Sequence, residues 1–121
     1  MRFLSIAIAR VDETAGWVPN EQYLAEMEKL LDELTRAGAL LDIGGLRPTR
    51  EGVRLRWNKG KLTKRDGPFT EAKEVIGGYG VFSANSLEEA TALATRFLAL
   101  HGDEGNVECE IRQIEEPDAR G

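Results

Sequence analysis

The sequence predicts a single ferredoxin-like α+β domain, with an antiparallel βαββαβ sheet, helices on one face and an inserted β-hairpin. Apolar residues alternate in several short segments, which is typical of strands, and recur every three or four residues in two longer segments, which is typical of helices. These segments follow one another in the order β-α-β-hairpin-β-α-β. Two helices with one apolar stripe each cover only one sheet face, so the other face, which is also apolar, needs a partner.

The first half of the chain predicts a strand, a helix and a second strand. "RFLSIAIAR" alternates, and Asn20 is placed to cap the helix that follows. Gly38 ends that helix because glycine readily adopts the left-handed conformation. The expected apolar stripe consists of Tyr23, Leu24, Met27, Leu30, Leu31 and Leu34. "ALLDIGGL" then predicts a short strand that stops before Pro48.

The second half predicts the hairpin, a strand, a helix and a last strand. "GVRLRWNKGKLTKR" forms the hairpin, with Gly60 taking positive φ in its turn, and residues 75–83 form the next strand. Ser86 opens a capping box. The second helical stripe consists of Leu87, Ala90, Leu93, Ala94, Phe97 and Leu98. "VECEIRQI" is the last strand; the domain is expected to span 1–116, with 117–121 as a polar tail.

Three glycines in the strand at 75–83 need a reason, because glycine weakens strand interiors. Strict alternation places Ile76, Gly78, Gly80 and Phe82 on one face and Val75, Gly77, Tyr79 and Val81 on the other. The two glycines between bulky residues on the first face predict a shallow groove. A packed helix, a partner chain or a ligand would approach the backbone there, and packing is the favoured explanation.

Charge is unevenly distributed. The net charge is −5, yet residues 47–65 contain eight of the sixteen basic residues and only one acidic residue. The acidic remainder of the chain argues against nucleic-acid binding. The basic hairpin, with Arg54 and Arg56 on one side, is either a solvated arm or a docking patch for an anionic ligand or an acidic protein.

The sequence gives no indication of a metal, a cofactor or a membrane span. Cys109 and His101 are the only cysteine and histidine, so neither an intrachain disulfide nor a clustered zinc site is expected. Phosphate-binding glycine motifs are missing from the sequence. An apolar run of about 20 residues, as a transmembrane helix requires, is also missing. The single thiol suits a cytoplasmic location.

Asp66, in the sequence Asp-Gly-Pro-Phe, is the main candidate for a site. Its carboxylate either accepts a backbone N–H to close the turn or acts as an acid, base or ligand anchor at a pocket mouth. Lys73 belongs to the charged stretch just before the strand at 75–83, and it would join Asp66 if that stretch turns inward. Tyr79 would offer a hydroxyl. Asp42 lies within an apolar strand and needs a partner if buried, such as Arg54, Arg56 or Lys64.

The stretch "DGPFTEAKEVIGGY", residues 66–79, resembles the DGPF-motif branch of the YCII-related proteins, in the dimeric α+β barrel superfamily. The resemblance covers nearly the whole chain. It implies a small, bacterial, cytosolic homodimer whose sheets face each other, with a possible link to extracytoplasmic-function sigma factors. It implies no established activity. Related YCII proteins carry a His–Asp pair in a pocket, whereas His101 here follows the second helix.

Three functions are compatible with these features. The leading hypothesis is a cytosolic accessory or regulatory homodimer that binds a small polar or anionic molecule near the Asp66 turn. The second is an enzyme that uses Asp66 and Tyr79, or Lys73, for acid–base chemistry. The third is a module that docks on a sigma factor or another protein through the basic hairpin, in which Arg54 and Arg56 would take part.

Overall fold

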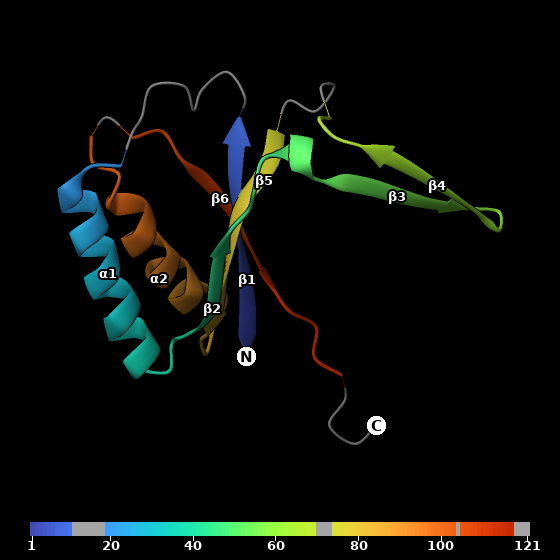
Figure 1. Ribbon diagram of the computed structural model, residues 1–121. Coiled ribbons are helices and arrows are strands. Elements are labelled where there is room, and N and C mark those ends of the chain that lie inside the picture. Colours follow the sequence, from blue (N-terminus) through green and yellow to red (C-terminus); the bar gives the residue numbers. More distant parts are fainter. Residues whose placement is uncertain (11–18, 70–73, 104, 118–121) are drawn as a thin grey trace.

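The computed structural model describes residues 1–10, 19–69, 74–103 and 105–117, and it confirms the predicted α+β fold (Figure 1). The elements in chain order are β1 (Arg2–Arg10), α1 (Glu21–Arg36), β2 (Leu40–Gly45), the 3-10 helix η1 (Thr49–Glu51), β3 (Val53–Asn58), β4 (Lys61–Asp66), β5 (Glu74–Ser83), α2 (Leu87–Ala99) and β6 (Glu108–Gln113). The main sheet has the strand order β2-β5-β1-β6, and all its pairings are antiparallel. Both helices cover one face of it.

Local capping signals fix the ends of both helices. The Asn20 side chain accepts a hydrogen bond from the backbone N–H of Tyr23, at 2.8 Å, and the Ser86 hydroxyl accepts one from Glu89, at 3.1 Å. Each bond satisfies a backbone donor that has no partner within its helix. Gly38, with φ of +74°, follows α1 as predicted.

The core lies between the helices and the sheet. Phe3 of β1 and Phe82 of β5 are its most deeply buried large side chains. The other buried apolar residues are Leu30, Leu34, Leu40, Ala84, Ala90 and Ala94. Most of the predicted helical stripes therefore face the sheet, but Leu24 and Leu87 are exposed and lie outside them.

A β-bulge corrects the predicted faces of β5. The pairing with β1 shifts at Ala7, so that Gly78 lies opposite Ala7 while Ile76 lies opposite Ile8. Opposite residues in an antiparallel pair share a face. Ile76 therefore shares a face with Tyr79, and the prediction that it shares one with Gly78 and Gly80 was wrong. The extra residue, Gly77, reverses the alternation.

The two faces of the sheet have different surroundings. The face under the helices carries Phe3, Ser5 and Ala7 of β1, paired with Phe82, Gly80 and Gly78 of β5. We call the opposite, helix-free side the outer face. Its apolar residues are Leu4, Ile6 and Ile8 of β1 and Ile76, Tyr79 and Val81 of β5. Glu108, Glu110 and Arg112 of β6 flank them.

The inserted hairpin β3–β4, residues 53–66, forms its own two-stranded sheet, and we call it the arm. It extends away from the helices, on the outer-face side of the main sheet (Figure 1). Lys59 and Gly60 both have positive φ, at 51° and 78°, as a tight two-residue hairpin turn requires. Every residue of both strands is exposed.

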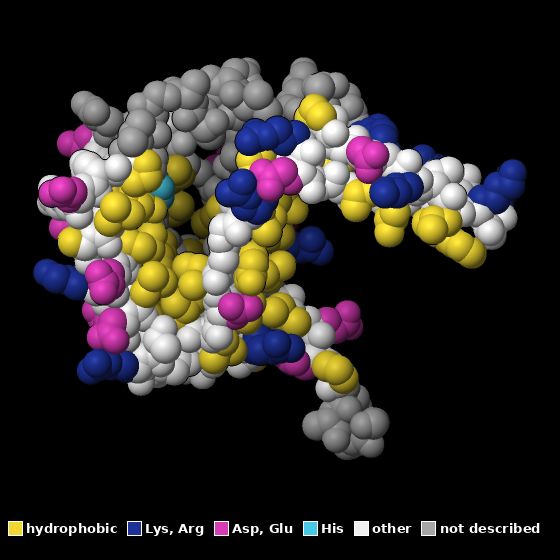
Figure 2. Space-filling view, in the orientation of Figure 1, with side chains coloured by type: hydrophobic (Ala, Val, Ile, Leu, Met, Phe, Trp, Pro, Cys, Tyr) yellow, Lys and Arg dark blue, Asp and Glu magenta, His cyan; other side chains and the backbone are white. Residues whose placement is uncertain are grey.

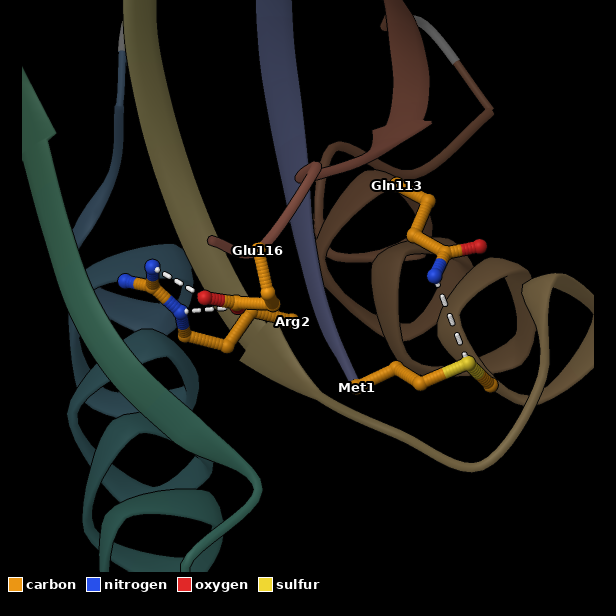
Figure 3. A network of polar contacts seen from close by, with 4 residues as sticks. All are labelled: Met1, Arg2, Gln113 and Glu116. Atoms are coloured by element: carbon orange, nitrogen blue, oxygen red, sulfur yellow. Dashed lines mark hydrogen bonds and ion pairs between the residues drawn. The ribbon is translucent and has the colours of Figure 1, made fainter. Parts of the chain in front are cut away.

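Contacts between the two ends of the domain tie the segment after β6 to β1 (Figure 3). Arg2 and Glu116 form a double contact, with Nε–Oε1 at 2.6 Å and Nη2–Oε2 at 3.0 Å. The hydrogen bond and charge of Arg2 hold the pKa of Glu116 below its usual value. Gln113 Nε2 contacts Met1 Sδ at 3.4 Å. Of the predicted tail, 118–121 lie outside the described residues.

Candidate functional site

A cavity of about 450 Å³ lies between the two helices and the main sheet. Figure 2 shows it as a hollow bordered by hydrophobic side chains. Its walls are Tyr23, Met27 and Leu31 of α1, Ala94, Phe97 and Leu98 of α2, His101 after that helix, Cys109 of β6, Ser5 and Ala7 of β1, Ile43, Gly44 and Gly45 of β2, and Gly78, Tyr79, Gly80 and Phe82 of β5. The surface offered to a ligand is mostly apolar.

Glycines on adjacent strands make room for this cavity. Gly78 and Gly80 lie on the helix-facing side of β5, and Gly45 lies opposite Gly78 on β2. A Cβ at Gly80 would make only ordinary contact with the Phe82 ring, at 3.7 Å, and a Cβ at Gly45 would meet nothing within 4 Å. A Cβ at Gly78 would instead lie 2.9 Å from the carbonyl oxygen of Gly44. The predicted groove thus has two causes: backbone packing at Gly78 and open space at Gly80.

Tyr23 and His101 supply polar groups to the cavity wall. Their rings approach with centroids 5.1 Å apart and planes inclined at 58°. His101 Nδ1 lies 3.1 Å from the Leu98 carbonyl oxygen, which orients the ring at the end of α2. Partial burial raises the pKa of Tyr23, so its hydroxyl keeps its proton at neutral pH. The pair can offer a ligand hydrogen bonds within an otherwise apolar wall.

Asp42 and Tyr79 form a polar pair on the outer face. The Tyr79 hydroxyl donates to Asp42 Oδ2 at 3.3 Å, and the Ile43 N–H donates to Oδ1 at 2.9 Å. The negative charge of Asp42, and then its hydrogen bond, raise the pKa of Tyr79. The expectation of a basic partner for Asp42 is therefore replaced by a tyrosine, and the carboxylate is exposed rather than buried.

Asp66 lies at the end of β4, where the arm returns to the body. Its side chain is 80% exposed, and its carboxylate lies 3.8 Å from Lys64 Nζ. The backbone N–H groups of Phe69 and Thr70 are the donors expected to close the turn on its carboxylate. Among the described contacts Phe69 makes no such bond, and Thr70 lies outside the described residues. Asp66 is not among the described residues that line the cavity. Of the candidate ligand residues that the structure describes, Tyr79 alone lines the cavity.

The residues after Asp66 pack against the base of the arm. Gly67 donates its N–H to the Gly52 carbonyl at 2.9 Å, and a Cβ at Gly67 would overlap the carbonyl oxygen of Thr49. The bond from Gly67 to Pro68 is cis. Only glycine fits this close approach of two backbones. The motif that carries the family resemblance therefore shapes the junction between arm and body.

The arginine candidates lie on the arm, away from the cavity. The Arg54 guanidinium stacks on the Phe69 ring, with Cζ 4.1 Å from the centroid, and that of Arg65 is 5.3 Å from it. Arg56 lies further along the arm, on the same face as Arg54. Lys73 lies outside the described residues. Asp66, Lys73 and Tyr79 are therefore not shown to form one cluster.

Sequence reasoning missed Tyr23 and His101 as a pair. Tyr23 was assigned to an apolar stripe, and His101 was considered isolated in a loop. The sequence does contain a signal for this pair. Tyr23, Met27 and Leu31 recur at four-residue spacing on α1, and His101 follows Leu98 by three residues. Each polar ring therefore lies at one end of a row of side chains that line the cavity. That the two rows meet over the glycines of β5 depends on tertiary packing.

Two features are absent from the part of the chain that the structure describes. Within residues 1–10, 19–69, 74–103 and 105–117, no group of three or more His, Cys, Asp or Glu side chains could hold a metal ion. In the same part of the chain, no helix has the length and apolar character needed to cross a bilayer.

Comparison with known proteins gives the family. The match to a solved structure of CutA from Xylella fastidiosa spans 96% of this chain and 86% of the CutA chain, at 16% sequence identity. Its TM-score is 0.40, and we base no argument on it. An uncharacterized protein, R00369, from Rhizobium meliloti (strain 1021) is 30% identical over 83 residues, which is 67% of each chain. The model of the YCII-related domain matches residues 1–100. The chain therefore belongs to the YCII-related domain family.

Proposed function

We propose that this protein binds a small, largely apolar molecule carrying one polar group, in the cavity between the helices and the sheet. The observation that carries the proposal is the cavity itself. Its volume of about 450 Å³ falls within the range of small-molecule sites, and its wall combines apolar side chains with a few polar groups. The earlier expectation of a polar or anionic ligand near Asp66 is replaced, because that carboxylate is exposed on the arm.

Tyr23 and His101 would recognise the polar group of the ligand. The tyrosine hydroxyl donates or accepts a hydrogen bond, and the imidazole does the same according to its tautomer. Both rings also offer apolar area. A hydroxyl or amide on a bicyclic or short-chain ligand suits these groups better than a carboxylate does, because no lysine or arginine is among the wall residues that the structure describes.

A homodimer formed through the outer face is the assembly that we propose. The face carries Ile6, Ile8 and Ile76 without a covering layer in the described chain, and burying such a surface against a second copy removes it from water. This assembly agrees with the resemblance of the sequence 66–79 to the DGPF-motif branch, in which we place the chain. The single cysteine suits the cytoplasm, where we expect the protein to act.

An enzyme that uses Asp66 and Tyr79 has less support. The raised pKa of Tyr79 keeps its hydroxyl protonated at neutral pH, so it acts as a hydrogen-bond donor to Asp42 rather than as a base. Asp66 is solvated, with Lys64 nearby, and lacks the burial that tunes a catalytic acid. Binding therefore explains the geometry better than acid–base catalysis does.

Fluorescence titration with 2-naphthol tests the proposed site, because this probe is bicyclic, neutral and carries one hydroxyl. Gly80→Val should weaken its binding at least tenfold by filling the cavity, and Tyr23→Phe should weaken it less, by removing one hydrogen bond. Ala92→Val is the control, since it adds two methyl groups at an exposed position of α2, away from the cavity, where Gly80→Val adds a whole isopropyl group inside it. Equal affinities for wild type and a folded Gly80→Val protein would place the probe elsewhere and refute the site.

A further inference from the structure

The arm has an apolar face that its own chain leaves exposed. Val53, Leu55 and Trp57 of β3 and Leu62 of β4 are between 46% and 71% exposed. Strand alternation and the pairing of Trp57 with Leu62 put all four on one face. Such a row of large apolar side chains on a thin hairpin is unusual in water and marks an interaction surface.

The arm stands where a second copy would meet it. It projects on the outer-face side of the main sheet, away from both helices (Figure 1). Hydrophobic side chains gather on the side of the arm that borders the open space next to the sheet (Figure 2). A second subunit packed on the outer face would occupy that space, and the apolar face of the arm would then lie against it.

The distribution of charge also favours a second copy of the chain as the partner of the arm. The arm, residues 53–66, carries six basic residues and one acidic residue, for a net charge of +5. The remainder of the chain, with ten basic and twenty acidic residues, carries −10. Glu108 and Glu110 project on the outer face at its β6 border. The face of the arm opposite the apolar row carries four of the basic residues, Arg54, Arg56, Lys61 and Arg65. The attraction between the positive arm and the negative body of a second copy therefore favours their approach as a whole, while the apolar row makes the contact.

The junction of the arm fixes its direction. The hydrogen bond from Gly67 to Gly52 closes the base, and Gly67 packs directly on the Thr49 carbonyl. Phe69, two residues after Gly67, stacks with the guanidinium of Arg54 from the arm. A hairpin held at its base loses less conformational freedom when its far end binds a partner.

We propose that the arm is an intersubunit clasp, whose apolar face packs on the body of a second copy of this chain. Two-fold symmetry makes the contact reciprocal, so that each subunit holds the other. The inference rests on the homodimer of the proposed function and is independent of the ligand. It assigns Trp57 and Leu55 a role that neither the cavity nor the outer face requires.

Tryptophan fluorescence tests the clasp in the intact protein. The chain has two tryptophans, so Trp17→Phe leaves Trp57 as the only indole. At micromolar concentration we expect Trp57 emission to be blue-shifted and protected from acrylamide, because the partner covers a side chain that is 71% exposed in one chain. Dilution that dissociates the dimer should return the emission to that of exposed tryptophan. Emission typical of exposed tryptophan throughout the dimeric range would overturn the clasp.

Sedimentation equilibrium separates the clasp from the dimer itself. The double variant Leu55→Ser/Trp57→Ser should raise the dimer dissociation constant at least tenfold, as expected for truncated apolar anchors. Thr63→Ala, on the opposite face of the same hairpin, should change it less than about threefold. A folded double variant with wild-type affinity would refute the clasp and leave the sheet-to-sheet dimer standing. A monomeric wild type would refute both, without touching 2-naphthol binding.

Discussion

Gly78 and Gly80 lie two residues apart on the same face of β5, yet alanine should have opposite effects at the two positions. At Gly80 a Cβ makes ordinary contact at 3.7 Å. Burying one methyl group contributes about 0.8 kcal/mol, and restricting the unfolded chain adds roughly 0.4–1 kcal/mol. Gly80→Ala should therefore stabilise the fold by roughly 1–2 kcal/mol. At Gly78 the Cβ would lie 2.9 Å from the backbone oxygen of Gly44, closer than real Cβ contacts occur.

The clash of a Cβ at Gly78 can be removed only if β2 moves, since the atom that it meets belongs to the backbone of Gly44 rather than to a flexible side chain. Overpacking of this kind costs roughly 1–3 kcal/mol, which exceeds the gain from the unfolded state. Gly78→Ala should thus destabilise by about 1 kcal/mol, a difference of roughly 2–3 kcal/mol between the two variants. Urea unfolding followed by circular dichroism, at one fixed protein concentration, measures it. With a slope near 1–3 kcal/mol per molar, the midpoints should differ by about 1 M. Coincident midpoints would refute this account of the two glycines.

Two further predictions concern the carboxylates. Asp66→Ala should change the free energy of unfolding by less than about 1 kcal/mol, because its ion pair with Lys64 is solvated; a larger loss in urea unfolding would show that Asp66 is structural. Asp42→Asn should lower the pKa of Tyr79 towards its ordinary value of 10.0, because a negative charge that disfavours the phenolate is removed. Ultraviolet titration in a Tyr23→Phe background follows Tyr79 alone, and an unchanged pKa would contradict the pairing.

The secondary structure could be predicted because its signals are local. Asn20 and Ser86 cap helices within three residues of themselves, and Gly38 follows its helix in the left-handed conformation. Apolar periodicity then identified the strands, and their order alone indicated the ferredoxin-like sheet. The hairpin turn was also predictable, since Gly60 provides the positive φ that a tight turn needs.

Features that depend on strand pairing could not be predicted. The bulge at Gly77 exists only in register with β1, and it moves Ile76 to the outer face. The partner of Asp42 is Tyr79, 37 residues away, because β2 and β5 are neighbours in the sheet. Alternation along one strand carries no information about either the bulge or the Asp42–Tyr79 pair. The sequence predicted a shallow groove at Gly78 and Gly80, with packing as the favoured explanation, but not that Tyr23 and His101 would border a cavity there.

The Asp-Gly-Pro-Phe motif has a structural explanation in Gly67 and Phe69, beside the two roles, turn closure and a carboxylate at a pocket mouth, that the sequence leaves open for Asp66. Gly67 is required because the backbone at Thr49 leaves no room for a side chain, and Phe69 provides the ring on which Arg54 stacks. Both contacts join the arm to the body, at a distance from the cavity walls. If the arm holds a second subunit, its orientation must be fixed before association, and this motif is the part of the chain that fixes it. The position of this motif outside the proposed ligand site is then expected, since the geometry of the proposed dimer would depend on it.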